Sequence, residues 1–291
     1  MKGLKTTIFS LLFSCSLVAQ DYTPSSDGQV VTHSYYSLSY DEQHEQAEWV
    51  YYKLTPAMIS GSAKRADDFR PDNKIKTQSA TLSDYAGSGY DRGHLCPAAS
   101  MSINAKAMSE SFYLSNMSPQ HPSFNRGAWK NLEELVRQWA AQEKEVYVVT
   151  GPIFKNNKGQ IGKSQVTVPG YYYKVVYVPA DKKMIGFVMP NEKIGNNLAS
   201  YVEDINEIEI LTGINFFPQL NDSLENALEA DSDVTEWEFA KSSYTAKAPA
   251  KKVSSTNAVS VQCRGISKST GKRCKNKTKS STGYCHIHQP K

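Results

Sequence analysis

Residues 88–95 read Ser-Gly-Tyr-Asp-Arg-Gly-His-Leu, and the interpretation of the whole chain starts from this stretch. The glycines allow a sharp turn beside His94, and Arg92 can offer a positive charge to an anionic substrate. A histidine suits general-base work because its ordinary pKa of about 6.5 lets it accept a proton from water at neutral pH. A single histidine in such a loop is more often structural, so the stretch needs partners elsewhere in the chain.

Candidate partners follow along the sequence. Residues 116–120 read NMSPQ, and residues 125–129 read NRGAW ahead of Glu133 and Arg137. The last two residues are four apart and can therefore share one side of a helix. Considered singly, Asn125 is a typical helix N-cap, and Glu133 with Arg137 is a typical exposed ion pair. The functional interpretation depends on taking these segments together.

The apolar pattern predicts an α+β domain. Aromatic and β-branched residues indicate a strand over residues 48–54, and similar strands are expected at 146–150, 172–178 and 184–189. Charged residues, glycines and prolines bound these segments. We therefore expect a mostly antiparallel sheet.

Helices are expected between and after these strands. Apolar residues recur every three or four positions over residues 126–142, which indicates an amphipathic helix. A shorter helix is expected after Ser200, whose hydroxyl would cap its first turn, and Gly213 would end it. The predicted helices would flank the sheet.

Composition divides the chain into five segments. Residues 1–20 form a predicted signal peptide, residues 21–48 a lead-in over the domain surface, and residues 49–240 the main domain. Residues 241–260 are rich in Ala, Ser, Lys and Thr and predict a flexible basic linker before a small tail over residues 261–291.

The N-terminal segment has the features of a secretory signal. Lys2 and Lys5 precede an apolar run over residues 8–18, with the small Ala19 after it. A membrane span needs about 20 apolar residues, so this run is short for a membrane helix. Cys15 leaves lipoprotein anchoring as an alternative. We expect a secreted or periplasmic protein.

The charge is distributed unevenly. The chain has 33 Lys and Arg against 29 Asp and Glu, and 12 of these bases but none of the acids lie in residues 241–291. Two more lysines lie in the predicted signal, so residues 20–240 carry about −10. A main domain that binds phosphate with this charge must use a few placed cations and a metal ion.

The ordered set of motifs resembles the DNA/RNA non-specific endonuclease family, the endonuclease G-like ββα-metal nucleases, over most of residues 45–220. The resemblance implies an α+β, ββα-metal (His-Me finger) nuclease fold with a mostly antiparallel sheet. The motifs that carry it are Arg65 and Phe69 in KRADDFR, Asp84-Tyr85, Asp91-Arg92-Gly93-His94, residues 116–120, residues 125–129, Glu133, Arg137, Thr150-Gly151-Pro152 and Phe216-Phe217-Pro218.

The resemblance also implies roles for residues of this chain. His94 would be the general base, Asn125 the direct ligand of one Mg²⁺, and Glu133 would hold a metal-bound water. An amide oxygen suits Mg²⁺, which keeps most of its waters; Mn²⁺ is a possible substitute.

Further residues would act on the phosphate. By resemblance, Arg65 and Arg92 would contact it, Arg137 would support the leaving group or the transition state, and Asn116 would support the site by hydrogen bonding. Such contacts carry no sequence information, so we expect cleavage of both DNA and RNA without sequence preference. The oligomeric state is open, and a homodimer is possible.

Acidic residues near the motifs are assigned no catalytic role. Asp91 is expected to fix its loop by hydrogen bonding. Asp67, Asp68 and Asp72 are expected to be solvated loop charges.

The tail holds Cys263, Cys274 and Cys285 at intervals of eleven residues, followed by His288. Three thiolates and one imidazole predict a tetrahedral structural Zn²⁺ site in a basic knob that could tether nucleic acid or equally bind a cell-envelope polymer. The alternative is disulfide pairing, since a secreted protein can oxidise these cysteines among themselves or with Cys96.

Three functions remain open from the sequence: a nuclease, a catalytically silent nucleic-acid-binding protein, and a toxin-like nuclease. The complete set of expected residue types favours the first over the second. No delivery domain is recognisable for the third.

Overall fold

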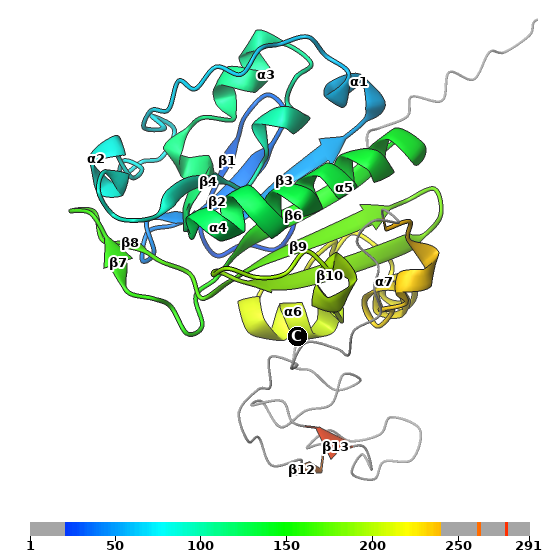
Figure 1. Ribbon diagram of the computed structural model, residues 1–291. Helices are drawn as coiled ribbons and strands as arrows, with labels where there is room; N and C mark the ends of the chain where they lie inside the picture. The colour runs from blue at the N-terminus through cyan, green and yellow to red at the C-terminus, as the bar shows by residue number, and fades with distance from the viewer. Residues whose placement is uncertain (1–20, 240–260, 263–276, 279–291) are drawn as a thin grey trace, which may run out of the picture.

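The computed structural model describes residues 21–239, 261–262 and 277–278. Its centre is a seven-stranded antiparallel sheet with strand order β1-β2-β3-β6-β9-β10-β11 (Figure 1). The strands of this sheet are β1 (Gln29–Thr32), β2 (Ser37–Asp41), β3 (Gln46–Leu54), β6 (Val146–Ile153), β9 (Tyr171–Val178), β10 (Lys183–Pro190) and β11 (Val202–Glu203). The antiparallel sheet and the four strands expected from the sequence are thereby confirmed.

Helices cover both faces of the sheet, as the α+β prediction requires (Figure 1). The α-helices are α1 (Pro56–Ile59), α2 (Leu82–Tyr85), α3 (Ala105–Glu110), α4 (Pro122–Phe124), α5 (Lys130–Gln142), α6 (Ile205–Thr212) and α7 (Asp222–Glu229). Single turns of 3-10 helix occur at Ala98–Ser100, Leu114–Asn116, Leu198–Tyr201 and Val234–Glu236, and a π-helical turn at Asn125–Trp129.

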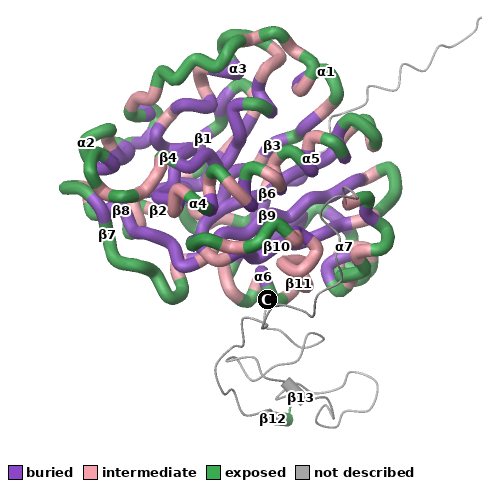
Figure 2. Tube along the Cα trace, viewed as in Figure 1, coloured by how far each residue is buried: buried purple, intermediate pink, exposed green. Residues whose placement is uncertain are grey.

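Alternation along the strands creates two cores. On β9, Tyr172 and Val176 pack into the core that contains the apolar side of α5, whereas Tyr173 and Val175 pack into the core under α6 and α7. Successive side chains of a strand point to opposite faces, so each strand of a covered sheet is apolar on both faces. Figure 2 shows the resulting buried centre and the exposed outer loops.

Two small antiparallel pairs lie outside the main sheet. Strand β4 (Asp91–His94) pairs with β5 (Met117–Gln120), and β7 (Gln160–Ile161) pairs with β8 (Val166–Thr167). The pair β4–β5 leads through α4 and the π-helical turn into α5, so the chain forms a ββα unit beside the main sheet.

The prediction that residues 21–48 form a lead-in over the domain surface is wrong. Residues 29–41 form β1 and β2, which extend one edge of the main sheet beyond β3. Short, polar sequences such as QVVT and SLSYD give a weak strand signal, although β2 is paired on both sides and only β1 lies at the edge. The folded domain therefore begins well before residue 49.

The helix expected after Ser200 is α6, but its cap differs. Asp204 caps it by accepting a hydrogen bond from the Asn206 amide, whereas Ser200 donates to the Asn197 carbonyl in the preceding 3-10 turn. Gly213 ends the helix in the left-handed conformation at φ 78°, as the sequence predicts.

The C-terminal segment is described only in part. Strand β12 (Val261–Gln262) pairs with β13 (Lys277–Thr278). The predicted zinc ligands Cys263, Cys274, Cys285 and His288 lie outside the described residues, as do the predicted signal peptide and linker. Among the described residues, no helix is long and apolar enough to cross a membrane.

Gly151 in β6 should be required by close packing between strands. A Cβ atom there would lie 2.2 Å from the Glu48 carbonyl oxygen and 2.7 Å from the Tyr173 hydroxyl, which donates a hydrogen bond to that carbonyl. Overpacking of this kind costs about 1–3 kcal/mol, so we expect Gly151→Ala to lower the free energy of unfolding by that amount in urea titration. Gly195→Ala, where the nearest atom lies at 4.0 Å, is the control. Equal unfolding midpoints for both variants would contradict the prediction.

Candidate functional site

Pairing of β4 with β5 places the central motif. His94 lies opposite Met117, and Asp91 lies opposite Gln120. Gly93 is needed between them because a Cβ atom there would lie 2.2 Å from the buried Gln120 side chain. The close approach of the two strands fixes where His94 and Arg92 project.

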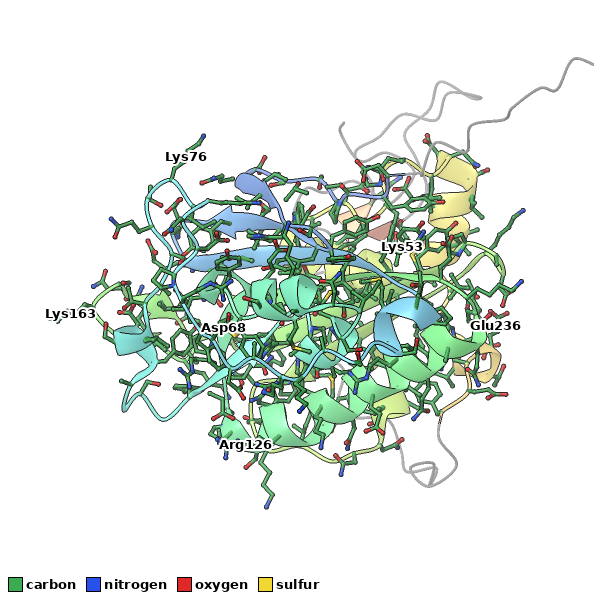
Figure 3. All side chains as sticks on the ribbon, turned by 90° about the horizontal axis from the view of Figure 1, so that it is seen from above. Lys53, Asp68, Lys76, Arg126, Lys163 and Glu236 are labelled. Carbon is green, nitrogen blue, oxygen red and sulfur yellow. The ribbon has the colours of Figure 1, made fainter. Side chains whose placement is uncertain are left out.

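Asp91 joins this pair to the helical part of the unit. Its Oδ2 accepts hydrogen bonds from Asn125 Nδ2 and Arg126 Nε, both at 2.9 Å, and its Oδ1 accepts from Arg126 Nη2 at 2.6 Å. Arg126 lies at the outer edge of the molecule, near the start of α5 (Figure 3). Asp91 acts by hydrogen bonding, as expected, although it ties two elements together rather than one loop.

The helix expected over residues 126–142 has two parts. Residues Asn125–Trp129 form a π-helical turn in which Gly127 is non-helical, and α5 follows from Lys130. Asn125 has helical backbone angles, and its side chain does not cap the helix. Trp129 Nε1 donates to the His94 carbonyl at 3.3 Å, which ties this turn to β4.

His94 lies buried between aromatic rings. The Phe69 and Phe112 rings meet its imidazole edge-on, at centroid distances of 5.8 and 5.0 Å. Burial, reinforced by the charges of Arg65 and Arg92, lowers the pKa of His94 to about 3. Its Nε2 is buried without a hydrogen-bond partner among the described residues. The imidazole is therefore neutral at pH 7, the form that a general base requires.

Two exposed arginines flank His94 on the same aromatic rings. The Arg92 guanidinium lies 4.1 Å from the Phe69 ring centroid, and the Arg65 guanidinium lies 4.8 Å from that of Phe112. Cation–π contact restrains each side chain without neutralising its charge. Arg65 also donates to Asp67 at 2.7 Å. The structure thus brings Arg65, Arg92 and His94 together.

Asn116 is fully buried behind this group. Its Oδ1 accepts from the Cys96 amide at 2.8 Å, and its Nδ2 donates to the carbonyls of Cys96 and Ser111 at 2.9 and 2.8 Å. The side chain is committed to backbone partners, so it supports the chain after β4 and does not reach a substrate.

Glu133 and Arg137 are half-buried on α5, and neither forms an ion pair within the described part of the chain. The exposed ion pair suggested by their spacing is therefore not formed. Burial raises the pKa of Glu133, against the opposing charges of Lys174, Arg137 and Arg65. The structure adds Lys174, a fully buried lysine on β9 that the sequence analysis missed. Its one signal is a single charge inside the apolar run YYYKVVYV.

The expectation of solvated acids holds for two of three residues. Asp67 and Asp68 are exposed and paired with Arg65 and Arg70. Asp72 is buried, which corrects the expectation. It accepts from Ser115 Oγ at 2.6 Å and lies 2.8 Å from His33 Nε2, so a local polar network compensates its burial.

The amide of Asn125 offers an oxygen donor to a hard divalent cation. Among the described residues, no group of three or more His, Cys, Asp or Glu side chains could hold an ion. Asn125 instead offers a single donor atom. Its amide nitrogen donates a hydrogen bond to Asp91, and no described residue donates to its Oδ1. A single neutral oxygen donor suits Mg²⁺, which is commonly bound by one or two protein oxygens and water.

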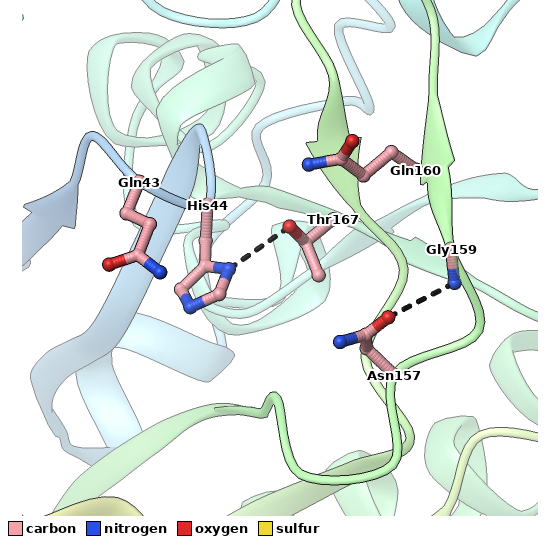
Figure 4. Close-up of a pocket in the computed structure, with 6 residues that line it drawn as sticks. All are labelled: Gln43, His44, Asn157, Gly159, Gln160 and Thr167. Atoms are coloured by element: carbon pink, nitrogen blue, oxygen red, sulfur yellow. Dashed lines mark hydrogen bonds between the residues drawn. The ribbon is translucent and has the colours of Figure 1, made fainter.

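A hollow of about 370 Å³ lies elsewhere, lined by Gln43, His44, Asn157, Gly159, Gln160 and Thr167 (Figure 4). His44 Nδ1 lies 3.0 Å from Thr167 Oγ1, and its ring stacks on Phe154. None of the predicted site residues lines this hollow. It is separate from the site around His94.

An antiparallel strand pair carrying His94, followed by a helical turn that carries Asn125 and leads into a helix, is the arrangement of the ββα-metal class of nucleases. Residues 16–223 match the DNA/RNA non-specific endonuclease family, and the chain belongs to that family. It is accordingly an enzyme that hydrolyses nucleic acid, and its family is consistent with dependence on a divalent metal.

Similar proteins are also nucleases. The chain is 33% identical over 221 residues to "Nuclease" of Nostoc sp., covering 71% of this chain and 80% of that protein. It is 37% identical over 209 residues to mitochondrial endonuclease G of Homo sapiens, covering 66% of this chain and 70% of that protein. A chain in the crystal structure of the EndoG/EndoGI complex superposes with a TM-score of 0.63 and 36% identity, covering 67% of this chain and 87% of that one.

We expect the His94 imidazole to stay neutral between pH 5 and 8. Its pKa lies at about 3, so the charged form should not accumulate until far below the value of about 6.5 for an unfolded chain. Long-range ¹H–¹⁵N NMR of imidazole-labelled protein, assigned with His94→Gln, would show this. A titration of the His94 nitrogens with a midpoint near 6.5 would contradict the prediction.

Proposed function

We propose that this chain is a secreted, magnesium-dependent endonuclease that cuts DNA and RNA without sequence preference, with His94 as general base and Asn125 as the direct metal ligand. The observation that carries the proposal is the neutral His94, held between Arg65 and Arg92 and tied through Asp91 to Asn125. His94, Arg92 and Asn125 belong to one ββα unit, and Arg65 reaches it from the segment between α1 and α2.

Phosphodiester hydrolysis needs a deprotonated water, compensation of the phosphate charge and a stabilised leaving oxygen. A ring nitrogen of His94 would take the proton from water. Arg65 and Arg92 are exposed and would contact phosphate, Arg65 in exchange for its exposed ion pair with Asp67, and Arg137 would act from α5. Magnesium held by Asn125, with Glu133 fixing one of its waters, would supply Lewis-acid stabilisation of developing negative charge.

The substrate preference follows from the kind of contact available. The proposed substrate contacts are made by guanidinium groups and a metal ion, which recognise phosphate. No base-reading element is required. The acidic main domain makes these few cations important, because it lacks a broad positive surface.

Digestion of plasmid DNA and of RNA with Mg²⁺ tests the proposed function. Loss of a general base costs about 10²- to 10⁴-fold, so we expect His94→Ala to lower the initial rate by that factor. Asn125→Ala should also lower the rate and raise the Mg²⁺ concentration needed for half-maximal activity. His44→Ala, at the separate hollow, is the matched histidine control and should cut like wild type.

Two outcomes would overturn this proposal. Equal cleavage by wild type and His94→Ala would remove His94 as the base. Absence of cleavage by the wild-type protein at any Mg²⁺ or Mn²⁺ concentration would favour a nucleic-acid-binding protein.

Secretion and a zinc-binding tail belong to the same proposal and rest on the sequence. The mature protein should begin close after Ala19, and it should contain one Zn²⁺ per chain bound by Cys263, Cys274, Cys285 and His288. N-terminal sequencing and metal analysis of protein purified from the exported fraction would check both. An unprocessed N-terminus would refute the signal peptide, and intact disulfides without zinc would refute the metal site.

A further inference from the structure

Lys174 is a fully buried lysine in the middle of β9. It lies opposite Thr150 on β6 and Phe187 on β10. Residues two apart on a strand share a face, so Lys174 points to the same side as Tyr172 and Val176, which pack in the core containing α5. The lysine therefore lies beneath the helix that follows Asn125.

A stripe of three side chains on this helix lies over Lys174. Trp129, Glu133 and Arg137 follow one another at intervals of four residues, which places them along one side of the helix. The Lys174 ammonium lies 4.5 Å from the Trp129 ring centroid. Among the described residues, Lys174 Nζ has no hydrogen-bond partner, and neither does Arg137 Nη1.

Packing alone does not account for a lysine at this position. A buried ammonium loses its hydration, and an apolar side chain of similar volume would avoid that cost. Lys183 on β10 shows the ordinary arrangement: its Nζ lies 2.7 Å from Glu143 and 3.2 Å from Asp181 while it packs on Trp237. Lys174 lacks such partners among the described residues.

Glu133 is the carboxylate that attracts Lys174 electrostatically. Of the charges near Glu133, Lys174 exerts the strongest attraction, and Glu133 in turn exerts the strongest attraction on Lys174. Glu133 itself forms no ion pair among the described residues, so no salt bridge sets its orientation. A fixed positive charge below α5 is the available constraint.

We propose that Lys174 is a positioning residue for Glu133: its buried charge, seated under Trp129, fixes the direction of the Glu133 carboxylate. Because Glu133 is the residue assigned to hold a metal-bound water, this inference rests on the proposed function. Trp129 connects the same lysine to the base, since its indole also donates to the His94 carbonyl. Lys174 thus acts through other residues and does not touch substrate.

Steady-state kinetics on plasmid DNA test the role. Loss of a group that orients a metal-site residue costs about 10- to 100-fold, so Lys174→Met should lower kcat by that factor, with KM changed less than about threefold. Lys174→Gln, which also removes the charge, should behave alike and serves if the methionine variant is unstable. Lys183→Met is the matched control, a strand lysine packed on a tryptophan outside the site, and should leave kcat unchanged.

A double-mutant cycle separates positioning from structure. In a Glu133→Gln background, Lys174→Met should cost little further activity, because the carboxylate it orients is gone. Thermal unfolding gives a readout that is independent of activity. Each single variant leaves one charge without its counterpart, so the melting temperature of the double variant should fall by less than the sum of the two single losses.

The outcomes are distinguishable from those for the proposed function. Wild-type cleavage with unchanged kcat in Lys174→Met, or additive effects on both activity and melting temperature, would overturn the positioning role alone. Absence of wild-type cleavage would overturn the proposed function instead, while the melting-temperature cycle would still report whether the two charges interact.

Discussion

The carboxylate of Asp91 is the interaction on which the ββα unit depends. It is the point where β4, placed by pairing with β5, meets the helical turn that follows β5. A carboxylate that accepts from an amide and, through both oxygens, from a guanidinium makes strong, directional hydrogen bonds. Its side chain is 17% exposed and that of Arg126 is 73% exposed, so water screens the bond from Asn125 less than the bonds from the guanidinium. The hydrogen bond to Asp91 consequently fixes the orientation of the Asn125 amide next to β4.

The aromatic rings around His94 explain how a neutral base can lie next to exposed cations. Phe69 and Phe112 bury His94 and at the same time support Arg92 and Arg65 on their faces. Burial and positive charge both disfavour protonation of the imidazole. The arrangement therefore keeps the base unprotonated while it gathers positive charge for phosphate, and a domain of net charge about −10 needs that local concentration.

The features that could be predicted from the sequence are those that depend on a local pattern of residues. The strands at β3, β6, β9 and β10 and the amphipathic helix α5 have strong periodicity, and motif order identified the family. Strands β1 and β2 were missed because their short, polar sequences resemble loops. Burial of Asp72 and Lys174 was missed for another reason: which distant elements cover a charged residue is a property of the tertiary fold. The Ser200 cap failed because Asp204 offers an equally good cap nearer to the apolar run.

Buried polar atoms without partners indicate where the fold has been shaped by something other than stability. Among the described residues, such atoms occur in His94, Gln120, Arg137 and Lys174, all in or beside the ββα unit, as well as at His33, Tyr85 and two glutamates of α7. Each costs about 1–3 kcal/mol when left unsatisfied, and an apolar residue would remove the cost. Asn116, close to the same unit, has every polar atom of its amide bonded. Asn116, which supports the chain, is thus satisfied internally, whereas His94, Arg137 and Lys174 keep a polar atom unpaired beside the proposed site, where substrate, metal or a neighbouring charge would complete them.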